Sequence, residues 1–357
     1  MILVTGGAGF IGANFIYEWI EQESAPVINL DKLTYAGNRH NLKGLENNSQ
    51  YTFVQGDILD RKLIQELLHR YQPKAVVHFA AETHVDRSID DPDVFVQTNI
   101  MGTVHLLEEC LNYWKKLDDR AKNDFHFLHM STDEVYGTLK ATDLSSKEKS
   151  PFDPSSPYAA SKAASDHFVN AFHHTYGLPT LIAHSSNVFG PYQFPEKLIP
   201  LTIVNAIQGK PIPLYGDGLN IRSWIYVKDL CGALRYVLRS GSLGEAYNIS
   251  EDMEKTNKNI VETICAILDQ LHPNSSQSPY ASLIQYITDR PGHDRRYSLN
   301  SNKIRNELGW QPKGDFESKL HQTVKWYLNN GEWLQKIMNG SYQNWIKDHY
   351  PHKQIVK

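Results

Sequence analysis

Two residues of this 357-residue chain, Tyr158 and Lys162, have the types and the spacing that the oxidation of an alcohol requires. They are four positions apart, so a helix places the phenol and the ammonium on the same face. A nearby cation lowers the pKa of a phenol, and the resulting tyrosinate takes a proton from an alcohol while a hydride leaves for a nicotinamide. Taken alone, such a pair is more often only a partly buried tyrosine on an amphipathic helix.

A glycine-rich turn at the start of the chain suits a dinucleotide cofactor. It follows an apolar run at 2–5, precedes a helical pattern at 10–23, and contains Gly6, Gly9 and Gly12. This spacing allows a tight turn and close approach of the backbone to a pyrophosphate, whose charge the helix N-terminus favours. Asp31 ends the next apolar run, where a carboxylate accepts from a ribose 2′-hydroxyl and repels a 2′-phosphate. The sequence therefore predicts NAD rather than NADP, although Lys32 weakens this preference a little.

Two adjacent acids, Asp133 and Glu134, extend the chemistry beyond that of a simple dehydrogenase. They follow Thr132 at the end of an apolar run at 125–131. Adjacent carboxyl groups can act as acid and base of an elimination if their surroundings push their pKa values apart. Neighbours on a regular strand point to opposite faces, so both reach one substrate only if the strand breaks here, as the nearby Gly137 suggests. The alternative is a pair of acids that merely caps the end of a strand.

The elements that must position these residues alternate between strand and helix patterns. Short β-branched runs predict strands at 2–5, 27–31, 51–57, 75–80, 125–131 and 180–186, and helical spacing predicts helices at about 10–23, 60–71, 93–116 and 158–176. Such alternation is typical of right-handed βαβ units and a parallel sheet with helices on both faces. After residue 187 prolines interrupt the pattern, and shorter helices are expected at about 197–208, 227–239, 257–271 and 315–328.

The expected fold is therefore α/β, a doubly wound parallel sheet of the Rossmann type with a smaller α+β substrate-binding domain. We assign residues 1–186 to the NAD-binding domain, to which part of 220–240 returns. Residues 187–345 mainly form the smaller, substrate-binding domain, and 346–357 are a tail. Residues 138–157, rich in Ser, Lys, Asp and Pro, are predicted to be a surface loop or lid.

Composition excludes several classes of function. The formal net charge of −4 offers no basic excess for a nucleic-acid partner. No apolar stretch approaches the roughly 20 residues of a membrane helix, and no secretory signal is visible at the start of the chain. The 3 cysteines lie far apart, which favours a reducing, cytoplasmic location over a disulfide framework. No group of histidines has metal-ligand spacing, so no metal is expected.

With these motifs together, the chain resembles the extended short-chain dehydrogenase/reductase family, and within it the dTDP-glucose 4,6-dehydratases. The resemblance extends to about residue 345 and is carried by the segments 5–12, 30–38, 83–88, 131–137, 156–162, 194–200 and 289–297. The first and fifth segments mark the broad family. The fourth and the last are much more specific to the dehydratases.

The resemblance implies a three-step cycle on a nucleotide-linked hexose. Tyr158 and NAD oxidise C4 to a ketone, water is eliminated across C5–C6, and hydride returns to C6 to give a 4-keto-6-deoxy sugar. Glu134 is the implied base and Asp133 the implied acid. Thr132 binds the C4 oxygen, and Lys162 also orients the nicotinamide ribose.

The resemblance also implies the residues that hold each ligand. Besides the three glycines and the catalytic pair, those for NAD are Phe10, Ile11, Asp31, Lys32, Leu33, Thr34, Asp57, Ile58, Phe79, Ala80, Ala81, Thr83 and Thr98. Those for the nucleotide-sugar are Thr83, Thr132, Asn187, Lys197, Leu198, Pro213, Tyr215, Arg222, Asn257, Arg290 and His293. Arg222 and Arg290 have the guanidinium groups that bind a diphosphate. On the NAD side, Asp57 is as readily explained as the N-cap of the next helix.

Some alternatives remain open at the level of sequence. Val188 and Ser223 stand where many of these dehydratases carry Asn and Asp, which puts the base and sugar specificity in question. Another NAD-dependent NDP-sugar dehydratase or a 4-epimerase is the main alternative, whereas a non-catalytic NAD-binding regulator has no use for an intact catalytic set. By analogy with the family, the helices at 93–116 and 158–176 are expected to form a four-helix bundle in a homodimer.

Overall fold

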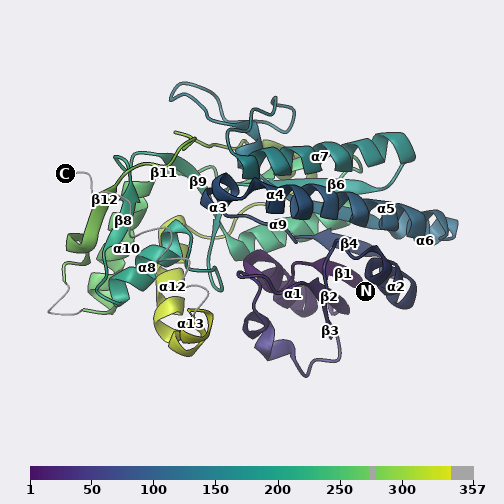
Figure 1. Ribbon diagram of the computed structural model, residues 1–357, viewed down its shortest axis with the longest axis horizontal. Helices are drawn as coiled ribbons and strands as arrows, with labels where there is room; N and C mark the ends of the chain where they lie inside the picture. Colours follow the sequence, from purple (N-terminus) through teal and green to yellow (C-terminus); the bar gives the residue numbers. More distant parts are fainter. Residues whose placement is uncertain (274–277, 339–357) are drawn as a thin grey trace.

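A seven-stranded parallel sheet forms the centre of the molecule (Figure 1), in a computed structural model that describes residues 1–273 and 278–338. Its spatial order is β3-β2-β1-β4-β5-β6-β10, and every neighbouring pair is parallel. The strands are β1 (Ile2–Thr5), β2 (Val27–Asp31), β3 (Tyr51–Gln55), β4 (Ala75–His78), β5 (His126–Thr132), β6 (Thr180–Ser185) and β10 (Ala246–Ile249). The strand order reverses between β1 and β4, which confirms the doubly wound fold.

The central strands are buried on both faces. Every residue of β1, β2, β4 and β6 is buried, which is why these segments are continuous apolar runs and do not alternate with polar residues. Such runs could be recognised in the sequence, and the predicted strands agree with the observed ones to within two residues at each end. The parallel sheet then brings the carboxyl ends of β1, β2, β4 and β5 to one edge, where ligands bind in folds of this type.

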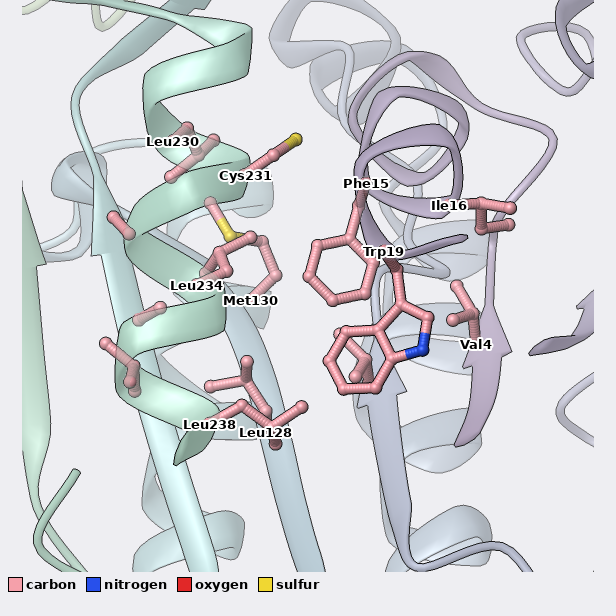
Figure 2. Packing of buried hydrophobic residues seen from close by; sticks show 14 of the residues in the cluster. Val4, Phe15, Ile16, Trp19, Leu128, Met130, Leu230, Cys231, Leu234 and Leu238 are labelled. Atoms are coloured by element: carbon pink, nitrogen blue, oxygen red, sulfur yellow. The ribbon is translucent and has the colours of Figure 1, made fainter. Parts of the chain in front are cut away.

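Helices cover both faces of this sheet. One face carries α2 (Arg61–Tyr71), α5 (Gly102–Lys115) and α7 (Pro157–Tyr176), with their own apolar core. The opposite face carries α1 (Phe10–Glu23) and α9 (Val227–Ser240). Figure 2 shows Phe15 and Trp19 of α1 pointing toward Leu234 of α9 and Met130 of β5. The packing of α9 therefore ties a segment beyond residue 220 to the first half of the chain.

Helix α7, which carries Tyr158 and Lys162, has clear signals at both ends. The Ser156 side chain accepts a hydrogen bond from the Ala159 N–H at 3.1 Å, and Pro157 occupies the first helical turn. The helix ends at Gly177, whose φ of 71° is the left-handed conformation that glycine adopts at low cost. These caps fix the register of the helix, and with it the direction of the two catalytic candidates.

A smaller α+β part has a separate apolar core. It contains a three-stranded sheet in the order β11-β9-β7 and a two-stranded sheet of β12 and β8. Its elements are β7 (Asn187–Phe189), α8 (Leu198–Ile207), β8 (Ile212–Tyr215), β9 (Ile221–Tyr226), β11 (Glu254–Thr256), α10 (Asn257–Leu271), η4 (Tyr280–Leu283), β12 (Ile284–Ile287), α12 (Phe316–Asn329) and α13 (Gly331–Ile337). In Figure 1 this part lies beside the large sheet.

Several elements differ from the sequence-based expectation. The predicted helix at 93–116 is three pieces, α4 (Pro92–Phe95), the π-helix η2 (Val96–Met101) and α5. Short helices that were not predicted are η4 and α13 of the smaller part and, in addition, η1 (Arg39–Leu45), α3 (Val85–Asp90), α6 (Asp119–Asp124), η3 (Asp133–Tyr136) and α11 (Asn302–Leu308). Strand β10 joins the large sheet although it lies within the range 187–345, because Tyr247 and Ile249 belong to the first core. Residues 339–345 of that range and the tail at 346–357 lie outside the described residues.

The loop at 138–157 is fixed to the surface of the protein. The Arg296 guanidinium donates to the carbonyls of Lys140 at 3.1 Å and Asp143 at 2.9 Å, and Ser146 pairs with Leu299. None of its residues lines the cavity described below, so the structure gives it no role as a lid. Within residues 1–273 and 278–338, no helix has the length and apolarity needed to span a membrane.

Candidate active site

A cavity of about 410 Å³ lies at the carboxyl edge of the parallel sheet and extends to the smaller part of the molecule. Every residue that the sequence placed in the site lines this cavity, with the exception of Leu33. Leu33 has a φ of 60°, and its backbone N–H donates to Asp31 Oδ1 at 2.8 Å. Leu33 therefore holds the Asp31 carboxylate through its backbone and does not itself line the cavity.

The glycine-rich turn has the shape that a pyrophosphate requires. A Cβ on Gly6 would lie 2.5 Å from the Ala80 nitrogen, and one on Gly12 would lie 2.4 Å from the Gly6 carbonyl oxygen, so both glycines are needed for packing. A Cβ on Gly9 would meet only the Gly6 oxygen, at 3.3 Å. Gly9 is the N-cap of α1 and has no side-chain cap, so the helix N-terminus faces the cavity. This arrangement fits the diphosphate of NAD.

The acids on the ribose side of the cavity are held by backbone groups. Asp31 accepts hydrogen bonds from the N–H groups of Ala8 and Leu33, both at 2.8 Å, while burial raises the pKa of its carboxyl. Asp57 accepts from the Leu59 N–H at 3.0 Å and pairs with Lys32 Nζ at 2.6 Å. The N-cap of α2 is Asp60. Asp57 therefore does not cap that helix.

Tyr158 and Lys162 lie together at the base of the cavity, but their electrostatics differ from the expectation. Lys162 Nζ donates to the Met130 carbonyl at 2.8 Å and lies 3.3 Å from His129 Nε2, so its charge is directed into β5. Burial lowers the pKa of Lys162 to about 8. Burial and the Glu134 charge raise the pKa of Tyr158, whereas a hydrogen bond with Thr132 opposes them. The lowering of the Tyr158 pKa by Lys162 is therefore absent from this structure.

The acid pair stands at a break in the strand, as the sequence required. Strand β5 ends at Thr132 and the 3₁₀-helix η3 begins at Asp133. Thr132 Oγ1 accepts from the Glu134 N–H and donates to Asp133 Oδ1, both at 3.3 Å. Gly137 ends the helix with a φ of 73°, and a Cβ there would lie 2.1 Å from the Asp153 carbonyl oxygen. Both carboxyl groups consequently line the same cavity.

The surroundings of the two acids push their pKa values apart. Asp133 is only 3% exposed, and burial followed by the Glu134 charge raises its pKa to about 8. Its carboxyl is therefore protonated at neutral pH, as a general acid requires. Burial also raises the pKa of Glu134, but three cations oppose this shift, namely Arg290, Lys197 and Arg222. Glu134 is thus the acid of the pair that more readily carries a negative charge.

The two arginines of the far half of the cavity are held by different partners. Arg222 is buried, donates to the Asp294 carbonyl at 2.9 Å, and lies over the Tyr297 ring at 4.4 Å from its centroid. Arg290 Nη1 donates to Asp86 Oδ1 at 2.8 Å, and the Tyr215 hydroxyl donates to the other Asp86 oxygen at 2.7 Å. Although burial alone raises the pKa of Asp86, the Arg290 charge holds it well below its usual range.

Asp86 connects the two parts of the molecule and was missed as a site residue. It lies on α3, between β4 and β5 in sequence, whereas Tyr215 and Arg290 come from β8 and from the loop after β12. The only signal was its place in the segment 83–88, which resembles the dehydratases. A second connection is made by Lys197, whose Nζ donates to the Thr83 carbonyl at 2.8 Å. The side chains of Asp86 and Lys197 thus tie the far half of the cavity to the first half of the chain.

Other lining residues were not singled out by the sequence, because most lie in loops between the elements, although Ser185 belongs to β6 and Trp224 to β9. They include Glu82, His84, Ser185, Ser186, Gln193, Phe194, Glu196, Trp224 and Tyr297. Glu196 accepts a hydrogen bond from the Tyr35 hydroxyl at 3.1 Å, and burial raises its pKa to about 7. Val188 lines the cavity, whereas Ser223 is fully buried and does not. Of the two departures from the dehydratase pattern, only Val188 is therefore placed to contact a ligand.

His293 completes the nucleotide side of the cavity. Its Nδ1 lies 2.6 Å from Asp289 Oδ1, and its ring meets that of Tyr215 edge-on with centroids 5.9 Å apart. Burial lowers the pKa of His293 to about 4, so the ring is neutral at physiological pH. In residues 1–273 and 278–338, no group of three or more His, Cys, Asp or Glu side chains is arranged to hold a metal ion.

Comparison with known proteins gives consistent matches over nearly the whole chain. Residues 3–323 match the family model described as GDP-mannose 4,6 dehydratase. A dTDP-glucose 4,6-dehydratase of Xanthomonas campestris pv. campestris is 54% identical over 96% of this chain and 97% of its own. The structure of DesIV, a dTDP-glucose 4,6-dehydratase from Streptomyces venezuelae solved with NAD bound, is similar with a TM-score of 0.85 and 42% identity, over 94% of this chain and 99% of its own.

More distant structures have other activities on the same fold. A UDP-glucose 4-epimerase of Thermus thermophilus, in complex with NAD, is 28% identical with a TM-score of 0.80, over 92% of this chain and 99% of its own. The fold and the cofactor are therefore common to dehydratases and epimerases.

Proposed function

The chain belongs to the family of the dTDP-glucose 4,6-dehydratases. We propose that its cavity converts dTDP-glucose into dTDP-4-dehydro-6-deoxy-glucose. The reaction is that of an NAD-dependent hydro-lyase. The observation that supports the assignment to particular residues is the strand break that turns Asp133 and Glu134 toward the cavity of Tyr158. Electrostatic differences between the two acids then distinguish an acid from a base.

Tyr158, Thr132 and Lys162 are the proposed groups for the redox steps. When bound, NAD supplies the acceptor for the hydride of C4 and the donor for the hydride that C6 receives. Tyr158 takes the proton of the C4 hydroxyl, and Thr132 Oγ1 hydrogen-bonds the C4 oxygen. Lys162, with its charge in a water-excluded site, orients the nicotinamide ribose.

Glu134 and Asp133 are the proposed groups for the elimination. A ketone at C4 makes the C5 proton acidic, so a carboxylate of ordinary strength is a sufficient base. Glu134 takes this proton, because the three nearby cations favour its ionised form. Asp133, which is protonated at neutral pH, donates its proton to the departing C6 hydroxyl. Glu134 returns its proton to C5 as the hydride reaches C6, whereas the Asp133 proton leaves with the water. Asp133 regains one proton by the end of the cycle, which balances the proton that Tyr158 took from the C4 hydroxyl.

The remaining residues fit a nucleotide diphosphate. The proposed phosphate ligands are Arg222 and Arg290, because guanidinium groups donate in pairs to phosphate oxygens. Asn187 and Lys197 reach the diphosphate and sugar from the same side. Tyr215, Asn257 and His293 bind the nucleoside, with Leu198 and Pro213 as apolar contacts. On the cofactor side we propose the NAD contacts given by the sequence, with Leu33 acting through its backbone.

Product analysis tests this function directly. Purified protein is incubated with dTDP-glucose and, in parallel, with other NDP-hexoses, and the alkali-absorbing 4-keto product is followed. We expect turnover with dTDP-glucose, a 6-deoxy product, and no net requirement for added reduced cofactor. A product that is epimerised at C4 and retains its C6 hydroxyl would show an epimerase instead.

Glu134→Gln tests the assignment of the base. The amide cannot accept the C5 proton, so elimination stops while slow C4 oxidation continues. We expect reduced nicotinamide absorbance to appear with dTDP-glucose and to persist. Asp217→Asn is a matched control, because Asp217 is an exposed acid paired with Arg295 at the surface. Dehydration by Glu134→Gln at the parental rate would remove Glu134 from the mechanism.

We also propose that the chain works as a cytoplasmic homodimer. Apolar side chains are exposed on the helices expected in a four-helix bundle, among them Val94 (42% exposed), Met101 (39%) and Phe168 (40%). Helices α5 and α7 lie side by side on one face of the sheet (Figure 1). A second copy placed there would cover this apolar surface. Sedimentation of the purified chain, with Phe168→Glu as the disrupting variant, tests the dimer.

A further inference from the structure

A buried polar cluster that the proposed mechanism does not use lies directly beneath Lys162. Its centre is Asp166, which is one turn further along α7 and has no exposed surface. Asp166 Oδ2 accepts from the Ser131 hydroxyl at 2.8 Å and lies 2.9 Å from His184 Nε2. A buried carboxylate is costly unless charged or polar partners surround it, so this cluster needs an explanation beyond packing.

His129 connects this carboxylate to the catalytic lysine. Its Nε2 lies 3.3 Å from Lys162 Nζ and 3.4 Å from Asp166 Oδ1. Burial lowers the pKa of His129 to about 4, so the ring is neutral. Its Nε2 is then either a donor to Asp166 or an acceptor from Lys162, and it makes one of these hydrogen bonds at a time. The cluster therefore contains one buried negative charge and one buried positive charge, with a neutral imidazole between them.

The other titratable groups around Lys162 supply no second negative charge beneath it. His78 on β4 lies with its ring centroid 5.2 Å from that of His129, and burial holds its pKa well below the usual range. His184 on β6 contacts Asp166 on the side away from His129. On the cavity side stand the Tyr158 phenol and, beyond it, the acid pair of η3. Among these groups only Asp166 opposes the effect of burial on the pKa of Lys162.

We propose that Asp166 is a positioning residue that keeps the Lys162 side chain charged in its water-excluded site, acting across His129. This inference rests on the proposed catalytic role of Lys162. A buried ammonium without a counter-charge loses its proton, because its desolvation is not compensated. Asp166 itself contacts neither ligand nor reacting atoms, since it does not line the cavity.

The test is the pH dependence of kcat in Asp166→Asn, a variant of nearly identical shape that lacks the charge. Deprotonation of Lys162 and of the proposed general acid Asp133 both lower activity at high pH, and removal of Asp166 must move the contribution of Lys162 to this alkaline limb to lower pH. We expect a shift of at least about one pH unit, which means a loss of about tenfold at pH 8 with little loss at pH 6. A uniform loss with the limb unmoved would overturn the proposal, because that is the signature of packing alone.

Two further variants separate charge from structure. Asp166→Glu keeps the charge, so its alkaline limb should stay where it is in the parent even if kcat falls. In a Lys162→Arg background the cation cannot deprotonate, so the alkaline limb that remains belongs to Asp133 and adding Asp166→Asn should no longer move it. His184→Gln, which alters the far side of the cluster and leaves Asp166 and His129 in place, should leave the limb unmoved. An equal effect of Asp166→Asn in both backgrounds would contradict the proposal.

A measurement on the parent protein covers the case in which Asp166→Asn does not fold. The rate at which Lys162 is acylated in the complete protein, followed against pH by peptide mass spectrometry, reports its protonation. We expect Lys162 to remain charged at pH 7. A Lys162 amine that is already neutral at pH 7 would overturn the proposal, while absent dTDP-glucose turnover in the parent would overturn the proposed function instead.

Discussion

The two halves of the cavity are held in place by different parts of the structure. The cofactor half is formed by turns that follow β1, β2 and β4, and its key positions are fixed by backbone contacts, such as those of Asp31 with Ala8 and Leu33. The sugar-nucleotide half is formed by loops of the smaller part, and its arginine at 290 is held by the Asp86 side chain. The difference indicates that single side-chain changes will alter substrate binding more readily than cofactor binding.

The largest effect is expected at the border of the two halves, where Tyr158 serves both. Tyr158→Phe removes the proton acceptor for C4 oxidation and should lower kcat by about 10²–10⁴-fold. Neither 4-keto product nor reduced nicotinamide should accumulate, which distinguishes it from Glu134→Gln. Tyr236→Phe is the control, because Tyr236 is exposed on α9. Near-normal turnover of Tyr158→Phe would show that Tyr158 is not the proton acceptor for C4 oxidation.

A smaller and selective effect is expected in the sugar-nucleotide half. Asp86→Ala releases Arg290 and Tyr215 together, which costs two hydrogen bonds to a charged group. We expect KM for dTDP-glucose to rise about 10–100-fold, with NAD affinity unchanged. Steady-state kinetics and NAD titration measure the two quantities separately, with the exposed Asp93→Asn as control. If Asp86→Ala weakens NAD as much as substrate, the two halves are not independent.

In the cofactor half, a substitution should weaken NAD binding and leave nucleotide-sugar binding unchanged. Asp31→Ala removes the proposed acceptor for the ribose hydroxyl and releases the turn at Ala8. NAD affinity should fall about tenfold, and the preference over NADP should shrink, because the repulsion of a 2′-phosphate is lost. Binding of dTDP by calorimetry should not change. An unchanged ratio of NAD to NADP affinity would exclude Asp31 as the determinant.

The smallest effect concerns stability and follows from the raised pKa of Asp133. The Asp133 carboxyl has a pKa of about 8 in the folded protein and near 4 in the unfolded chain. Unfolding between these pH values releases its proton, so the free energy of unfolding of the protein falls as the pH rises from about 4 to about 8. Asp133→Asn removes this dependence. Its free energy of unfolding should exceed that of the parent by at least about 1 kcal/mol at pH 8, with a smaller gain at pH 5. Denaturant titrations at both pH values measure the difference, and a gain that is equal at both would contradict the raised pKa.

The same contrast explains what the sequence could predict. The strands β1 and β2, helix α7 and the glycine turn were located because each depends on local patterns of burial, capping and turn geometry. The strand break at Asp133 could be inferred from the presence of Gly137. Asp86 and Glu196 could not be found in this way, because their roles depend on partners more than 100 residues away. The expected lowering of the Tyr158 pKa was wrong, because the direction of the Lys162 side chain depends on the Met130 carbonyl, which only the tertiary structure places.

The central claim is that one bound hexose meets both the redox groups and the acid pair. It is tested most directly with dTDP-glucose that carries deuterium at C4, in ordinary water, with mass-spectrometric location of the label in the product. We predict that the deuterium is found at C6 of the 4-keto-6-deoxy product. Deuterium that is lost to solvent, or that returns to C4 of an epimerised sugar, would contradict the account.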